Sequence, residues 1–161
     1  RLILTPFKEE DAEEYLKIIS NAEVKKYVPY GSAETLDGTK ELLNVYVEGD
    51  FNHDFYVCVR LKNNRKIIGS IIAVSMTRTV LDVSYLIDSH ERNKGYCTEA
   101  LQGFIQYLSE NNFCSCRLSL TIEKENQASL NVVQKVNGKK YRSLSSSEVY
   151  RIKIDDLLEL L

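Results

Sequence analysis

Residues 92–100 read RNKGYCTEA, and they lie between a strand-like run of residues, 80–87, and an amphipathic helix expected from about Thr98. A loop that carries glycine between a strand and a helix exposes backbone N–H groups that have no acceptor within the helix. These donors, together with the positive end of the helix dipole, favour a bound phosphate. Arg92 and Lys94 add positive charge at the same place. The stretch therefore predicts a site for a phosphorylated small molecule.

Length and composition narrow the class of protein. The chain has 161 residues, of which 43% are hydrophobic and 27% charged, and this predicts one globular domain over residues 1–161. A net charge of −2 and the lack of a long basic run argue against nucleic acid as a partner. The sequence shows neither an apolar run of membrane-spanning length nor a signal peptide, so we expect no membrane partner and a cytoplasmic location.

The cysteines and histidines do not predict a metal site or a nucleophile. Cys114 and Cys116 are spaced like half of a metal site, but a zinc ion needs about four ligands and no second Cys or His pair is present. We therefore expect reduced cysteines and no metal. His53 and His90 lack an accompanying nucleophile pattern, so we interpret both as loop residues.

The spacing of apolar residues predicts the remaining elements. Strands are expected at residues 1–5, 55–61, 66–76, 80–87, 116–122, 139–142 and 148–154. Helices are expected around 12–19, from 33 to 48 (burying Leu36, Leu43, Tyr46 and Val47), from about 98, and after Asn126. Asn126 is a good N-cap for the last of these, and Asn137–Gly138 suits its end. The order predicts an α/β (α+β) fold with a mixed, mostly antiparallel central sheet of about seven strands and helices on both faces.

Three passages in this order resemble one family. They are RLILTPF at 1–7 with Asp11 after it, YLID at 85–88 followed by KGYCTEA at 94–100, and NQAS at 126–129 followed by KVNG at 135–138. Together with the element order, they resemble the GNAT superfamily of acyl-CoA-dependent N-acetyltransferases over nearly the whole chain. The resemblance is closest to the branch that includes the ribosomal-protein N-terminal acetyltransferases.

The resemblance implies a GNAT fold that binds acetyl-CoA as a co-substrate. It implies that the pyrophosphate is held by Arg92, Asn93, Lys94, Gly95, Tyr96, Cys97 and Thr98. The backbone of Leu86 and Ile87 is implied to bond the pantetheine amides like an added strand, in a gap where the fourth and fifth strands splay. Asn126 and Ser129 are implied to reach the pantetheine arm and the region of the sulfur.

The sequence also departs from the family's pattern. Asn93 stands where this branch often has glycine, but asparagine tolerates left-handed dihedrals better than most residues. Cys97 replaces alanine or glycine beside the diphosphate, and Lys139 replaces an aromatic residue. Many relatives carry a tyrosine acid seven residues after the asparagine, and here that position is Val133. The usual acid is therefore in doubt.

The catalytic residues are hypotheses with stated alternatives. Asp82 is assigned as general base because this branch commonly carries an acidic residue there; otherwise it is a solvated residue or a partner of Arg78. Ser129 is the candidate donor of a proton to the sulfur, or else only the third residue of its helix. Tyr141 is a second candidate acid, or a packing residue, and a backbone N–H in 85–87 is expected to stabilise the oxyanion.

Two further expectations concern reactivity and substrate. Cys97, at a helix start among cations, is a candidate for a depressed pKa and a mixed disulfide with coenzyme A. The favoured acceptor is a protein or peptide N-terminal amine, which titrates near ~8, against ~10.4 for a lysine ammonium, and so needs only mild help from a base. The alternatives are a small amine such as a polyamine or aminoglycoside, and a non-catalytic acyl-CoA-binding module. A homodimer is left open.

Overall fold

The structure is a computed structural model that describes residues 1–27, 33–48, 54–113 and 115–154. Predictions that fall on Pro29, His53 and Cys114 lie outside these residues. Its strands are β1 (Leu2–Pro6), β2 (Phe55–Leu61), β3 (Ile67–Thr77), β4 (Val80–Ile87), β5 (Arg117–Glu123), β6 (Lys139–Ser143) and β7 (Ser147–Lys153). Its helices are α1 (Ala12–Ile19), α2 (Ala22–Lys25), α3 (Leu36–Glu48), α4 (Tyr96–Glu110) and α5 (Gln127–Lys135), with short 3-10 turns η1 (Glu9–Asp11) and η2 (Ser89–Glu91).

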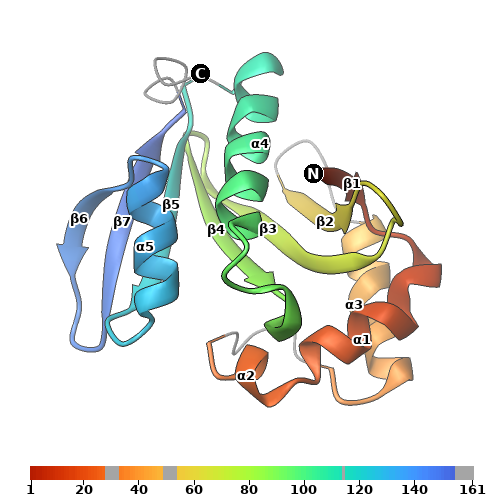
Figure 1. The fold of residues 1–161 in the computed structure, drawn as a ribbon. Helices are drawn as coiled ribbons and strands as arrows, with labels where there is room; N and C mark the ends of the chain where they lie inside the picture. The colour runs from red at the N-terminus through yellow and green to blue at the C-terminus, as the bar shows by residue number, and fades with distance from the viewer. Residues whose placement is uncertain (28–32, 49–53, 114, 155–161) are drawn as a thin grey trace. The chain divides into compact units, whose positions relative to one another are not determined.

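One sheet contains all seven strands, in the order β1-β2-β3-β4-β5-β7-β6 (Figure 1). The β1–β2, β5–β7 and β6–β7 pairs are antiparallel, and β4 and β5 are parallel. The predicted fold class and strand count are therefore confirmed. Within the described residues, no helix is both long and apolar enough to cross a membrane.

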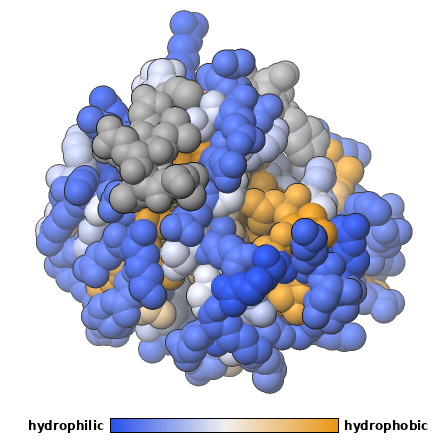
Figure 2. Space-filling model, turned by 45° about the horizontal axis from the view of Figure 1, so that its top comes forward, coloured by the Kyte–Doolittle hydropathy of each residue, from blue (hydrophilic) through white to orange (hydrophobic). Residues whose placement is uncertain are grey.

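The chain divides into two compact units. The first comprises residues 1–72 and 85–96, and the second comprises residues 73–84 and 97–161. The division cuts β4, so the N-terminal part of this strand belongs to the second unit and its C-terminal part to the first. On the face seen in Figure 2, hydrophilic residues predominate and hydrophobic ones gather in a limited patch.

The first unit packs α1 and α3 against its strands (Figure 1). Phe7, Tyr15 and Tyr46 are buried in its core, and the ring centroids of Phe7 and Tyr15 lie 4.8 Å apart. At the edge of this core, Arg60 forms an ion pair of 2.6 Å with Asp11. The predicted burial of Val47 is wrong, because this residue lies in the last turn of α3 and remains 41% exposed.

The second unit places α4 and α5 on one face of its strands (Figure 1). The expected apolar stripe of α4 is buried, and so are the residues of β5 on the same side of the sheet. These residues are Leu101, Phe104, Ile105 and Leu108 of α4, and Leu118, Leu120 and Ile122 of β5. The opposite face of these strands carries polar residues, among them Asp82, which is exposed.

Candidate active site

The loop between β4 and α4 has the backbone geometry of an anion site. Asn93 and Gly95 both have positive φ, at 61° and 79°. Left-handed residues that alternate with ordinary ones turn successive backbone N–H groups toward one point, where an anion binds. The helix begins at Tyr96, two residues earlier than predicted, so the amides of its first turn add to these donors. The tolerance of Asn93 for a left-handed conformation is confirmed.

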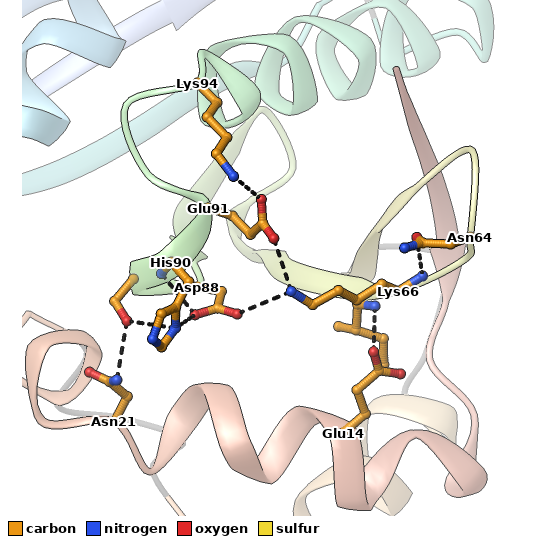
Figure 3. Close-up of polar contacts among 10 residues, drawn as sticks. Glu14, Asn21, Asn64, Lys66, Asp88, His90, Glu91 and Lys94 are labelled. Carbon is orange, nitrogen blue, oxygen red and sulfur yellow. Dashed lines mark hydrogen bonds and ion pairs between the residues drawn. The ribbon is translucent and has the colours of Figure 1, made fainter.

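Lys94 is tied to the first unit by an ion-pair network (Figure 3). Its Nζ lies 2.7 Å from Oε2 of Glu91, and the other carboxylate oxygen of Glu91 lies 2.9 Å from Nζ of Lys66. Hydrogen bonds from Lys94 and then Lys66 hold the pKa of Glu91 below its ordinary value. The charge of Lys94 is therefore largely matched by Glu91. This lysine acts first as an anchor of the loop to the start of β3.

The turn before the loop is fixed by further polar contacts (Figure 3). Asp88 caps η2 by accepting a hydrogen bond of 3.1 Å from the backbone N–H of His90. Asn21 donates a hydrogen bond of 3.1 Å to the hydroxyl of Ser89. Arg92 donates from Nη2 to the carbonyl of Glu23 at 3.0 Å, so this predicted phosphate ligand is oriented by α2.

Arg1 contacts this loop, and the sequence did not indicate that contact. Its Nη1 donates a hydrogen bond of 3.0 Å to the carbonyl of Lys94, and its guanidinium lies 4.6 Å from the centre of the Tyr96 ring. The backbone of Arg1 is held at the sheet by a hydrogen bond of 2.9 Å from Lys62. Arg1 therefore brings a third guanidinium or ammonium group to the loop. No local pattern signals it, because 93 positions separate it from Lys94.

The end of β4 lies very close to β3. A Cβ atom placed on Gly69 would lie 2.1 Å from the carbonyl oxygen of Leu86, so only glycine fits at this position. The carbonyl of Leu86 thus packs against β3, and the structure gives no support to a role for this oxygen in binding a ligand. The implied roles of the Leu86 N–H and of Ile87 stay predictions.

Asp82 lies where β4 and β5 part. Their parallel pairing covers Val80 to Asp82 and has its last pair at Asp82 and Ser119, although both strands continue for several residues. The end of this pairing agrees with the splay that the resemblance implies, and the gap itself stays a prediction. The Asp82 side chain is exposed, yet desolvation by neighbouring atoms raises its pKa above the ordinary value. Among the residues described, Asp82 forms no ion pair with Arg78, so that alternative finds no support. The general base and the solvated aspartate both stay predictions.

The structure confirms the predicted capping of α5. The side-chain oxygen of Asn126 accepts a hydrogen bond of 3.1 Å from the backbone N–H of Ser129, which is therefore the third residue of the helix. Val133 is fully buried, and a Cβ on Gly138 would lie 2.4 Å from its Cγ2. Val133 is thus a packing residue. Asn137, at the end of the helix, has a φ of 58°, as its left-handed tolerance predicted.

The hypothesis of a reactive Cys97 is wrong. Desolvation raises the pKa of its thiol to about 12, so the thiol is protonated at neutral pH. The cations of the loop do not offset this burial. Cys97 is therefore a partly buried, protonated thiol at the start of α4.

The candidate residues divide between the two units. The first unit contains Leu86, Ile87 and residues 92–96. The second contains Asp82, Cys97, Thr98, Asn126 and Ser129. Each group has the local geometry described above, and their joint action in one site remains a prediction.

Comparisons with known proteins agree with this geometry. Residues 1–139 match the family model described as an acetyltransferase (GNAT) domain. An uncharacterized N-acetyltransferase of Bacillus subtilis, YnaD, is 28% identical over 138 residues, which cover 84% of this chain and 78% of that protein.

Solved structures share the fold at low identity. An acetyltransferase of the GNAT family from Bacillus anthracis matches with a TM-score of 0.82 and 22% identity, over 96% of each chain. The spermidine N-acetyltransferase from Vibrio cholerae, in complex with CoA and spermine, matches with a TM-score of 0.81 and 16% identity, over 98% of each chain. The ribosomal-protein-S5-alanine acetyltransferase from Vibrio fischeri matches with a TM-score of 0.75 and 23% identity, over 96% of this chain and 94% of that one.

Proposed function

The chain belongs to the GNAT acetyltransferase family and is an acetyl-CoA-dependent N-acetyltransferase, and we propose that its acceptor is the α-amino group of a protein or peptide. The observation that carries this proposal is the place of Asp82. An exposed carboxylate with a raised pKa lies at the last pair before β4 and β5 separate. Such a group is a better proton acceptor than an ordinary aspartate.

The choice of an α-amino group as acceptor rests on how easily each kind of amine loses its proton. An α-amino group titrates near ~8, whereas alkyl ammonium groups such as that of lysine titrate near ~10.4. Among the described residues, no second acidic side chain is paired with Asp82. A single carboxylate suits the α-amino group, which is the easier of the two amines to deprotonate. Near neutral pH, a peptide N-terminus loses its proton at a smaller cost in free energy than a lysine ammonium does, and so needs less help from Asp82.

The loop before α4 fits the diphosphate of coenzyme A. The positive φ of Asn93 and Gly95 turns amides to one side, and Arg1 and Arg92 place guanidinium groups on the same loop. These are the features that an extended diphosphate requires. The proposed ligands are the backbone amides of residues 92–98, with Asn126 and Ser129 near the pantetheine arm.

Acetyl-CoA, when bound, supplies an acetyl group held as a thioester. In the proposed reaction, Asp82 takes a proton from the acceptor ammonium, and the neutral nitrogen forms a bond to the acetyl carbon. A backbone N–H of residues 85–87 donates to the oxygen as it gains charge. The carbon–sulfur bond then breaks and the nitrogen loses its second proton. The Ser129 hydroxyl is the candidate relay: it gives its proton to the sulfur and takes the proton that leaves the nitrogen, so the amide and free coenzyme A form and Asp82 keeps the first proton until it passes to water. We further propose that residues 1–161 act as one catalytic domain, in the cytoplasm.

The test measures the release of free thiol from acetyl-CoA with a panel of amines. The panel contains a peptide with a free α-amino group, the same peptide blocked at its N-terminus but carrying lysine, spermidine and an aminoglycoside. We expect thiol release only with the free N-terminus, and a mass increase of one acetyl group on that residue. Equal turnover of spermidine or the aminoglycoside would overturn the assignment of the acceptor.

A further inference from the structure

One face of the sheet in the second unit carries neither α4 nor α5, and we call it the open face (Figure 1). On it, Asp82 is exposed and Ser119 is buried. The register places Asp82 of β4 opposite Ser119 of β5, and Ser119 opposite Arg151 of β7. Residues directly opposite one another on neighbouring strands point to the same face of a sheet. The three side chains therefore form one row, on the face opposite to α4 and α5 (Figure 1). Because Asp82 is exposed, this row begins at solvent.

The charge of this face is mostly positive. Register and alternation place five cations on it, namely Arg117, Lys139, Arg142, Arg151 and Lys153. The carboxylates on the same face are Asp82 and Glu123. A surface with this balance attracts an anionic ligand and repels a polycation. The open face therefore favours an acceptor that carries negative charge.

Arg151 is the cation on this face with the most defined geometry. Its Cζ lies 3.6 Å from the centre of the Tyr141 ring, and Tyr141 is itself 54% exposed. Its buried Nε has no hydrogen-bond partner, and the structure gives Arg151 no ion pair within the described parts of the chain. No described residue therefore competes with a ligand for this guanidinium. Stacking on an aromatic ring also fixes the plane of the guanidinium before a ligand arrives.

We propose that Arg151, held on Tyr141, binds an acidic side chain of the acceptor peptide while the peptide's α-amino group lies at Asp82. Two strand spacings separate Asp82 from Arg151, which is roughly 10 Å, and an extended peptide advances about 3.3 Å per residue. The acidic residue is therefore the third or fourth of the acceptor. The substrate class is N-termini followed shortly by aspartate or glutamate. This inference rests on the proposed N-acetyltransferase activity and deepens it.

The experiment uses peptides that differ only at the third residue, as aspartate, asparagine or lysine. We expect the wild-type enzyme to have a KM for the aspartate peptide roughly ten- to a hundredfold below that for the lysine peptide, as for a hydrogen-bonded charge pair. Arg151→Gln is expected to remove most of this preference, and Arg151→Glu to reverse it. Arg151→Lys keeps the charge without the planar fork and is expected to keep part of the preference.

Two controls separate this inference from general damage and from the proposed function. Lys135→Gln removes one positive charge from α5, away from the open face, and is expected to leave the peptide preference unchanged. The KM for acetyl-CoA should not change in any Arg151 variant. A wild-type preference for the lysine peptide, or an unchanged preference in Arg151→Glu, would overturn the role of Arg151. No turnover of any peptide would instead contradict the proposed function.

Discussion

The guanidinium of Arg1 donates a hydrogen bond of 3.0 Å to the carbonyl of Lys94 and so joins the first strand to the loop before α4. The same side chain lies over Tyr96, and a Cβ on Gly95 would lie 3.5 Å from its Nη2. Arg1 thus contacts Lys94 and Tyr96, the residues on either side of Gly95. It positions the backbone that we propose to hold the diphosphate, and it adds charge there.

Arg1→Gln is expected to raise the KM for acetyl-CoA roughly three- to tenfold. This is a small effect for the loss of a hydrogen bond from a charged group, because Arg1 is exposed. The kcat at saturating acetyl-CoA and the KM for the amine should stay nearly unchanged. Steady-state kinetics with each substrate varied in turn measures both. Lys62→Gln, in the turn after β2, is the matched control, and an equal effect there would contradict a specific role for Arg1.

Substitutions at Gly95 and Asn93 test whether the positive φ angles of this loop are needed to bind CoA. Gly95→Ala forces a residue with a Cβ into a φ of 79°, which costs roughly 1–2 kcal/mol. The nearest atom to that Cβ is at ordinary contact distance, so the cost is conformational and not a clash. We expect CoA to bind roughly tenfold more weakly by calorimetry. Asn93→Gly keeps a positive φ accessible and should bind CoA as the wild type does.

Asp82→Asn is expected to separate activity from stability. Loss of a general base lowers kcat/KM by about a hundredfold or more and abolishes the rise of activity with pH. Burial raises the pKa of Asp82 in the folded protein, so the ionised carboxylate lowers the free energy of unfolding at pH values above this pKa. The effect vanishes as the pH falls below the pKa of the unfolded state, because the carboxyl is then protonated in both states. The variant should therefore have an equal or slightly higher Tm at pH 7, and the difference should disappear near pH 3. Unchanged kcat/KM across pH would rule out the catalytic role.

Much of this molecule follows from local sequence signals. The bounds of β2 and β4, the apolar stripe of α4 and the cap at Asn126 were all predicted, because each depends on residues within a few positions. Contacts between distant segments were not, as Arg1 with Lys94 and Lys66 with Glu91 show. The pKa of Cys97 was misjudged for a similar reason. Nearby charges are visible in a sequence, whereas burial depends on the whole fold.

Cys97 provides a direct test of that burial. The pKa of the Cys97 thiol is raised to about 12, which is roughly four pH units above pH 8. Fewer than about one molecule in a thousand then carries the thiolate at pH 8. Iodoacetamide should leave Cys97 unmodified in the folded protein and alkylate it after denaturation, as peptide mass spectrometry can show. Rapid labelling in the native state, or a disulfide with coenzyme A, would be inconsistent with a buried thiol.

The most direct measurement of the central claim is calorimetric titration of coenzyme A and acetyl-CoA into the wild-type protein, with its folding verified by circular dichroism. We predict a saturable heat with one site per chain for both ligands, weakened in Gly95→Ala and Arg1→Gln and retained in Asp82→Asn. No heat from either ligand on folded protein would contradict the proposal that the loop before α4 holds a diphosphate.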